Sequence, residues 1–267
     1  MTDAHRDRLR QMRREPPPLQ PVAVVARLER SPRLLRITLA GDGLRDLVVE
    51  QPASSVRLLI PSPGAAGLQR PEWDGNQYLL ADGSRAVLRT FTPVNHDRGE
   101  GRLDLDIVRH PGGAVSTWAE TVEPGSPAAI SGPARGYEPD PTATRLLVLG
   151  DETALPAAAQ VVAAAGRTEV HLEVAEATAL IDMAGPADRP PTWHVTEPGA
   201  RPGWALVGVV QQLTALDPGT RVWAAGEAAA MQAIRTHLFG TLGVARSQAE
   251  VRGYWKARNP TGSPTPM

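Results

Sequence analysis

Residues 145–165 read RLLVLGDETALPAAAQVVAAA, and this stretch decides the fold of the second half of the chain. Arg145–Gly150 is an apolar run with the length of a buried strand. Ala154–Ala165 is rich in alanine, which has the highest helix propensity, so we expect a helix directly after the strand. A buried strand that passes directly into a helix is typical of a parallel sheet with helical crossovers.

The same alternation of strand and helix continues to residue 255. The expected strands span 169–174, 192–195, 221–225 and 250–255, and the expected helices span 205–213 and 227–238. We therefore predict an α/β domain with a parallel sheet over residues 141–258, followed by a tail at 259–267. Such sheets bind ligands at the carboxyl ends of their strands.

The first half of the chain contains short β-rich segments separated by turn residues. The segments span 22–28, 34–39, 56–60, 86–92 and 103–108. Turn sequences such as Gly41-Asp42-Gly43 interrupt them. Short strands at this spacing predict a small Greek-key β-barrel, which we assign to residues 16–140 after a charged tail at 1–15.

Composition excludes several kinds of site. The chain has no cysteine, which excludes disulfides, iron–sulfur clusters and thiolate metal sites. No pair of its six histidines has the spacing of metal ligands on a helix, so we expect no protein-bound metal. The net charge of −1 argues against nucleic-acid binding, and no apolar run is long enough to span a bilayer. We expect a cytoplasmic monomer that binds neither nucleic acid nor a membrane.

Arg89-Thr90-Phe91-Thr92 lies in one of the expected barrel strands. Side chains alternate along a strand, so Arg89 and Phe91 share one face. An arginine fork suits a phosphate, and a neighbouring aromatic ring suits a planar ligand. An ordinary strand with one exposed arginine and one core phenylalanine explains the same residues, so the motif alone does not decide.

A second motif, RHPGGAVSTW at 109–118, directly follows the expected strand 103–108. Paired glycines open the backbone, and Ser116 or Thr117 is suited to cap a helix that begins there. A helix N-terminus offers free N–H groups and the positive end of a dipole to a diphosphate. A glycine turn with a helix cap is common, but its combination with a candidate phosphate arginine in the same barrel is far more specific.

Together these motifs resemble the siderophore-interacting proteins, a branch of the ferredoxin–NADP reductase-like flavoproteins. The resemblance covers roughly residues 20–258, and its landmarks are RTFT (89–92), DIVRHPGGAVSTWAE (106–120), SGPARG (131–136), GDETALPA (150–157), WAAGEAAAM (223–231) and GYWK (253–256). GDETALP and GYW are quite specific, whereas RTFT recurs across the superfamily. The sequence departs from the family pattern at Phe91, Val94 and Pro111, where tyrosine, arginine and glycine are usual.

The resemblance implies that the barrel domain binds FAD. It implies that Arg89 binds the diphosphate, that Phe91 stacks on the flavin or ribityl chain, and that Thr92 meets the isoalloxazine. It also implies that the glycine turn and helix start cradle the diphosphate. The expected FAD-binding residues are Arg89, Thr90, Phe91, Thr92, Asp106, Val108, His110, Gly112, Gly113, Ala114, Val115, Ser116 and Thr117.

The α/β domain is the expected site of the electron donor, NADPH or NADH. Its first turn, GDETALP, does not match the GxGxxG motif of dinucleotide-binding turns. Asp151 and Glu152 suit a helix N-terminus, but their negative charge repels a pyrophosphate. Simple helix capping explains the two carboxylates equally well. The expected nucleotide contacts are Asp151, Thr153, Ala154, Pro156, Gly226 and Glu227. Reduced ferredoxin is the alternative donor.

Ferric siderophores are often anionic, so a pocket for them should present cations. The expected substrate-binding residues are Arg135, Arg246, Lys256 and Arg258. Lys256 is the only lysine among 28 basic residues, and it follows the GYW motif. The resemblance implies that this motif approaches the flavin, so we expect Tyr254, Trp255 and Lys256 at the catalytic centre. Solvated surface charge is the alternative explanation for the arginines.

The sequence thus predicts an FAD-dependent reductase that passes electrons from NAD(P)H to ferric-siderophore complexes and releases iron as Fe(II). Hard oxygen chelators hold ferric iron more tightly than ferrous iron, so reduction loosens the metal without a protein ligand. Two alternatives stay open. One is a general NAD(P)H- or ferredoxin-linked flavin reductase, and the other is a flavin-bearing siderophore-binding module with little catalysis.

Overall fold

The computed structural model describes residues 18–75, 77–183 and 190–257. The chain divides into two compact units. The first contains the chain up to Arg30 together with Leu34–Glu50 and Ser54–Gly136. The second contains Ser31–Arg33, Gln51–Ala53 and the chain from Tyr137 onward. No helix among the described residues is long and apolar enough to cross a membrane.

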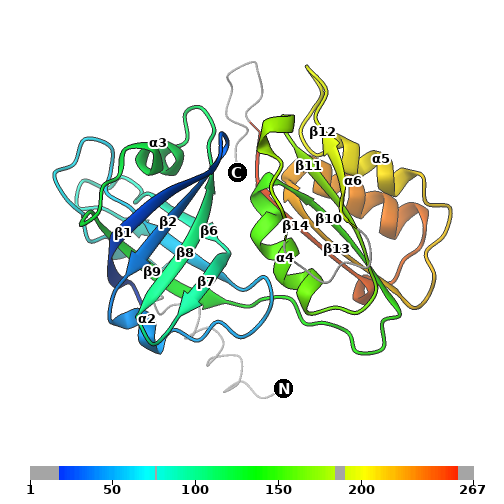
Figure 1. Ribbon diagram of the computed structural model, residues 1–267, viewed down its shortest axis with the longest axis horizontal. Helices are drawn as coiled ribbons and strands as arrows, with labels where there is room; N and C mark the ends of the chain where they lie inside the picture. Colours follow the sequence, from blue (N-terminus) through cyan, green and yellow to red (C-terminus); the bar gives the residue numbers. More distant parts are fainter. Residues whose placement is uncertain (1–17, 76, 184–189, 258–267) are drawn as a thin grey trace. The chain divides into compact units, whose positions relative to one another are not determined.

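An antiparallel sheet of seven strands forms the first unit, in the order β6-β3-β9-β1-β2-β8-β7 (Figure 1). These strands are β1 (Gln20–Ser31), β2 (Leu34–Ala40), β3 (Ser55–Leu59), β6 (Leu88–Phe91), β7 (Pro93–Asp97), β8 (Arg102–Val108) and β9 (Pro127–Ala134). A separate hairpin and two helices complete the unit: β4 (Glu72–Trp73), β5 (Tyr78–Leu79), α2 (Gly43–Asp46) and α3 (Ala114–Thr121).

Alternation of side chains builds the core of this sheet. Along β2, Leu35, Ile37 and Leu39 are buried, and they pair in register with β8, whose Leu103, Leu105 and Ile107 are also buried. The residues between them point the other way, which places the guanidinium of Arg36 against the carboxylate of Asp106. The alternation of side chains along β2 and β8 therefore forms the core of this unit.

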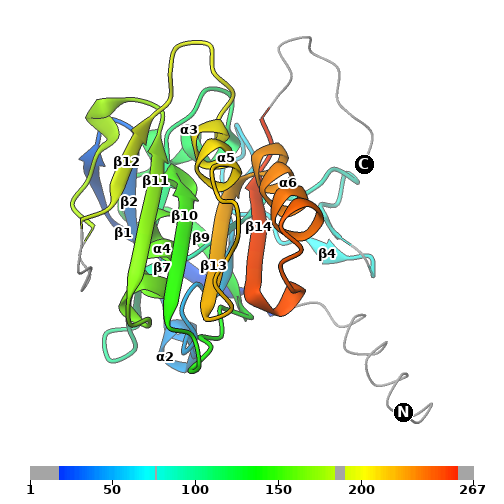
Figure 2. The same ribbon diagram turned by 90° about the vertical axis from the view of Figure 1, so that its right-hand side faces the viewer.

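A parallel sheet of five strands forms the second unit, in the order β12-β11-β10-β13-β14 (Figure 2). The strands are β10 (Arg145–Asp151), β11 (Thr168–Val174), β12 (Thr192–Val195), β13 (Thr220–Glu227) and β14 (Ala249–Trp255). The helices are α4 (Leu155–Ala163), α5 (Trp204–Gln211) and α6 (Ala228–Thr236), with short helical turns η1 (Glu152–Ala154), η2 (Ala177–Ala179), η3 (His237–Thr241) and η4 (Arg246–Gln248).

Helices cover both faces of the parallel sheet. One face packs against α4, and the other packs against α5 and α6 (Figure 2). Strand β10 serves both cores, because Val148 belongs to the first and Leu149 to the second. This arrangement confirms the predicted fold class, an antiparallel β unit followed by an α/β unit with a parallel sheet.

Two histidines meet on the edge of this sheet. His171 Nδ1 on β11 lies 3.1 Å from His194 Nε2 on β12, and the rings stack with their centroids 5.4 Å apart. On the other side of the ring, His171 Nε2 lies 3.1 Å from a carboxylate oxygen of Glu169, which also pairs with Arg145. Burial lowers the pKa of both histidines below the ordinary value of 6.5, and Arg145 lowers that of His171 further.

We predict that this pair makes stability depend on pH. Because the folded state disfavours protonation of both rings, the unfolded chain binds more protons and stability should fall as the pH drops through 6.5. Thermal unfolding followed between pH 8 and pH 5 measures the effect. Replacement of both His171 and His194 with glutamine should flatten the decline in melting temperature below pH 6.5. An identical decline in wild type and variant would contradict the prediction.

Candidate functional site

Helix α3 has an N-terminus without a side-chain cap. The helix begins at Ala114, and its N-cap residue is Gly113, with no acidic residue in the first turn. The expectation that Ser116 or Thr117 caps this helix is wrong, because both residues lie inside it. Ser116 is buried, and its hydroxyl oxygen instead accepts a hydrogen bond from the His110 amide at 3.0 Å. The first amides of α3 therefore point at a region that no side-chain cap fills.

The turn before α3 is shaped by its glycines. Gly112 has a φ of 71°, which lies in the left-handed region. A Cβ atom on Gly113 would collide with the ring of His110, which lies over the turn. The structure thus brings His110, Gly112 and Gly113 together around the start of α3. This geometry fits a diphosphate-binding turn, although the Ser116 hydroxyl is already bonded to the His110 amide.

Arg89 and Phe91 lie on β6 at the edge of the antiparallel sheet. Arg89 is exposed, and its guanidinium donates to the neighbouring Leu88 carbonyl oxygen at 2.9 Å. Within the described part of the chain no carboxylate pairs with it, so its charge is available to an anion. Phe91 is half-buried against the core of the unit, and Thr92 is buried where the chain turns from β6 into β7.

The remaining expected FAD residue with a charge, Asp106, is already engaged. Its two carboxylate oxygens accept hydrogen bonds from Arg36 at 2.7 and 2.9 Å. This ion pair joins β2 to β8 and leaves little of the carboxylate exposed. Thr90 is exposed on β6, and Val108 is half-buried at the end of β8. The Asp106 side chain therefore stabilises the pairing of β2 with β8. Its backbone is the part of the residue that is left to contact a cofactor.

Asp151 ends β10 and holds the carboxyl edge of the parallel sheet together. One of its oxygens accepts hydrogen bonds from the amide and the hydroxyl of Thr153, at 2.9 and 2.6 Å. The other accepts one from the indole N–H of Trp255 at 2.7 Å, and the Glu227 amide also bonds to this carboxylate. Burial raises the pKa of Asp151, and the hydrogen bonds from Thr153 and Trp255 lower it again. Asp151 therefore caps η1, which is the helix-capping explanation that the sequence offered for this carboxylate.

Two further glutamates cap the helices that follow. Glu227 ends β13, and one of its oxygens accepts from the amides of Ala229 and Ala230 at the start of α6, at 2.6 and 3.0 Å. Glu173 on β11 accepts from the amides of Gly203 and Ala205 at the start of α5, at 2.5 and 3.0 Å. Both carboxylates are buried. The N-termini of α5 and α6 are therefore occupied by side chains of the chain itself.

Glu152 has a different role from Asp151. It forms a bidentate ion pair with Arg33, at 2.8 to 3.0 Å, and accepts from the Ala175 amide at 2.8 Å. The sequence analysis missed the roles of Arg33 and Glu173. The one signal in the sequence was Glu173 near the end of an apolar strand, because a buried charge there needs a hydrogen-bond or ion-pair partner. Thr153, Ala154 and Pro156 lie in η1 and the first turn of α4, where the sequence predicted nucleotide contacts.

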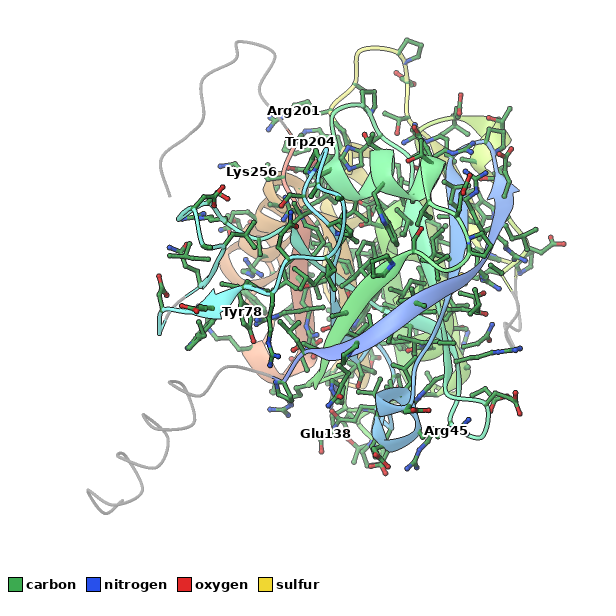
Figure 3. The ribbon with its side chains drawn as sticks, turned by 90° about the vertical axis from the view of Figure 1, so that its left-hand side faces the viewer. Arg45, Tyr78, Glu138, Arg201, Trp204 and Lys256 are labelled. Atoms are coloured by element: carbon green, nitrogen blue, oxygen red, sulfur yellow. The ribbon has the colours of Figure 1, made fainter. Side chains whose placement is uncertain are left out.

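The GYWK segment ends β14 with alternating side chains. Tyr254 packs against the apolar core on the α4 face. Trp255 is 36% exposed and directs its indole N–H to Asp151. Lys256 follows the strand and is exposed, as Figure 3 shows, and no described carboxylate forms an ion pair with it. Of the three expected catalytic residues, Lys256 is therefore the one with an exposed charge.

Arg246, another expected substrate cation, lies far from Lys256. Arg246 lies in η4, before the first residue of β14, with its guanidinium 5.2 Å from the Phe239 ring. Lys256 follows the last residue of that seven-residue strand, which at about 3.3 Å per residue places the two backbones roughly 20 Å apart. One small chelate therefore cannot contact both residues. Arg135 is exposed after β9 in the first unit, and Arg258 lies outside the described residues.

No group of three or more His, Asp or Glu side chains within residues 18–75, 77–183 and 190–257 is arranged to hold a metal ion. The buried carboxylates instead accept hydrogen bonds from N–H and O–H groups of the chain. What the structure offers for chemistry is an uncapped helix N-terminus with a glycine turn in the first unit, and an exposed lysine in the second.

We predict that Gly226 is required by Asp151. Gly226 has a φ of 156°, and a Cβ atom there would lie 2.6 Å from a carboxylate oxygen of Asp151. Gly226→Ala should therefore destabilise the protein by about 2–4 kcal/mol in denaturant unfolding, through steric clash and a broken hydrogen bond. Gly208→Ala is the matched control, because that helical position has open space and should gain about 0.5–1 kcal/mol. Equal stability of the two variants would contradict the prediction.

Both halves of the chain match known protein families. Residues 23–137 match the model of the siderophore-interacting FAD-binding domain, and residues 143–258 match that of the siderophore-interacting protein. The ferric vibriobactin reductase ViuB of Vibrio cholerae is 28% identical over 85% of this chain and 85% of its own length.

Two solved structures are also similar. A siderophore utilization protein from T. fusca superposes with a TM-score of 0.78 and 29% identity, over 91% of this chain and 94% of that one. The ferredoxin reductase in carbazole 1,9a-dioxygenase has a TM-score of 0.64 at 16% identity, over 90% of this chain and 70% of that one, which shows a shared fold. The two family models together extend over nearly all of the described chain, and the chain belongs to the siderophore-interacting protein family.

Proposed function

We propose that the protein binds FAD in its first unit and uses electrons from NAD(P)H to reduce ferric-siderophore complexes, releasing iron as Fe(II). The match to a siderophore-interacting FAD-binding domain supports the cofactor, and the similarity to a ferric vibriobactin reductase supports the reaction. The residues of this chain must then bind the flavin nucleotide, receive the donor and attract the chelate.

The observation that carries the proposal is the contrast between helix N-termini. The start of α3 has no side-chain cap, whereas the starts of η1, α5 and α6 are capped by Asp151, Glu173 and Glu227. Helix α4 also lacks a side-chain cap, but it directly follows η1 and has Pro156, which carries no amide N–H, in its first turn. Free amides and a helix dipole favour an anion, and capping carboxylates exclude one. A diphosphate is therefore best accommodated in the first unit, where Arg89 also carries a charge that no described carboxylate neutralises.

Each residue of this site has a definite task. The amides at the start of α3 and the guanidinium of Arg89 bind the diphosphate of FAD. The half-buried ring of Phe91 offers an apolar surface to the flavin or ribityl chain, and Thr92 supplies a hydroxyl. When bound, FAD can accept two electrons from a donor and pass them on one at a time. No side chain of this cysteine-free chain performs that conversion.

The second unit supplies the contacts for the donor and the substrate. NAD(P)H contacts fall on Thr153, Ala154 and Pro156, because the carboxylates beside them accept hydrogen bonds from the chain itself. Lys256 attracts the anionic ferric chelate through an exposed ammonium group without an ion-pair partner among the described residues. Reduction then loosens the iron, since hard oxygen chelators hold ferrous iron weakly.

We predict that Arg89→Ala weakens FAD binding about tenfold or more, because a charge-assisted hydrogen bond of about 1.5–3 kcal/mol is lost. Titration of apoprotein with FAD, followed by flavin fluorescence, measures the change. Arg102→Ala removes another exposed arginine of the same unit and should leave the affinity unchanged. Purified protein that is colourless and does not take up FAD would refute the cofactor assignment.

We predict that Lys256→Ala slows reoxidation of the reduced flavin by an anionic ferric chelate several-fold and leaves NAD(P)H-driven flavin reduction nearly unchanged. Anaerobic stopped-flow absorbance separates the two half-reactions, with ferric EDTA as the chelate. Arg246→Ala is the matched control, because this cation lies at the other end of β14. High salt should weaken the chelate step in wild type by screening the charge.

Three results would count against this function. Flavin that neither NADPH nor NADH bleaches would make a protein such as reduced ferredoxin the donor. Reduced flavin that ferric chelates do not reoxidise would favour a siderophore-binding module. An equal effect of Lys256→Ala and Arg246→Ala would move the substrate site away from the end of β14.

A further inference from the structure

The two motifs that distinguish this chain most clearly, GDETALP and GYW, meet in one hydrogen bond. Asp151 of the first motif accepts from the indole N–H of Trp255 of the second at 2.7 Å. The two residues are 104 positions apart in the chain. Asp151 is buried, while Trp255 is 36% exposed, so the bond fixes a partly exposed aromatic ring to a buried acceptor.

A second carboxylate holds the residue two positions further on. Glu227 uses one oxygen to cap α6 and the other to accept from the Ala257 amide at 3.1 Å. Ala257 lies beyond the last residue of β14, so no strand pairing holds its backbone. The segment is thus anchored on both sides of Lys256, by the side chain of Trp255 before it and by the amide of Ala257 after it.

The local backbone is built to allow this double anchor. The pairing of β13 with β14 shifts register between Gly226 and Glu227, so that Glu227 lies opposite Trp255. At the same point Gly226 has no room for a side chain, because the Asp151 carboxylate lies against it. The Glu227 amide bonds to Asp151 as well. The two anchoring carboxylates are therefore linked to each other, and both lie beside this register shift, where β14 has one residue more than β13.

We propose that Asp151 and Glu227 are positioning residues that hold the segment 254–257 in one conformation and so present Lys256 to the anionic ferric chelate. The inference rests on the proposed function of Lys256 and adds to it the groups that fix its backbone. A residue just past a strand end is ordinarily free to fray, and a mobile lysine loses conformational entropy when it binds. Anchoring its neighbours removes part of that cost before the chelate arrives.

The structure suggests variants that release the segment and retain the helix caps. In Glu227→Gln, the remaining oxygen can keep the two bonds to α6, and the new amide group then faces the Ala257 N–H, donor against donor. In Asp151→Asn, the oxygen can likewise keep both bonds from Thr153, and the amide group then opposes the Trp255 indole N–H. Trp255→Phe removes the same bond from the other side and retains an aromatic ring.

Glu173→Gln is the matched control. Glu173 is also a buried carboxylate that caps a helix at the carboxyl edge of the same sheet. It contacts α5 and Thr196 rather than the segment 254–257. A general loss of stability should therefore appear in all the variants, whereas release of the segment should appear only in Asp151→Asn, Glu227→Gln and Trp255→Phe.

Two measurements on FAD-loaded full-length protein test the proposal. Hydrogen exchange read by mass spectrometry should show amides of residues 254–257 exchanging about tenfold faster in the three release variants, as expected when a hydrogen bond is lost. In stopped-flow reoxidation by ferric EDTA, the half-saturating chelate concentration should rise about three- to tenfold in the release variants. Glu173→Gln should match wild type in both.

The outcomes separate the inference from the proposed function. Unchanged amide exchange in the release variants would overturn the inference. It would also be overturned if exchange is faster but the half-saturating chelate concentration is unchanged in these variants, while Lys256→Ala does change that concentration. If Lys256→Ala has no effect on chelate saturation, the substrate role of Lys256 fails. The exchange measurement needs no substrate, so it still decides whether the two carboxylates hold the segment.

Discussion

The carboxylate of Asp151 is the interaction on which the second unit depends. It lies where β10 ends, and it accepts hydrogen bonds from the turn that starts α4, from β13 and from β14. A buried carboxylate is costly unless its lone pairs are satisfied, and here the donors come from three separate segments. Its burial therefore requires those segments to be in place, which couples the end of the chain to the first strand of the sheet.

The same device recurs at neighbouring strand ends. Glu173 at β11 and Glu227 at β13 each satisfy the amides at the start of a helix, and Glu152 satisfies the amide of Ala175. In many parallel sheets these amides bind the phosphates of a ligand. Here the chain itself supplies anions to the starts of η1, α5 and α6.

Five strands of the first unit and the main strands and helices of the second were predicted to within a few residues, because β-rich runs, turn residues and alanine content are local signals. Strands β7 and β9 were not among the predicted segments. The strand expected at 169–174 is β11 at 168–174, and the helix expected at 205–213 is α5 at 204–211. The capping network was beyond such reasoning. Glu173 and Gly203 are 30 residues apart, and Arg33 and Glu152 are 119 apart. At α3 the sequence misplaced the cap, because Ser116 bonds backward to His110.

The distribution of caps fits a difference between resident and transient ligands. Under the proposed function, FAD stays bound through every cycle, whereas the electron donor must leave after each one. Tight binding of a departing ligand lowers its Michaelis constant without raising turnover once the site is saturated. The uncapped start of α3 suits the resident diphosphate, and helix starts filled by Asp151, Glu173 and Glu227 suit a donor that is released. Under the same proposal, Asp151 and Glu227 hold the end of β14, and Lys256 beside it meets the anionic chelate.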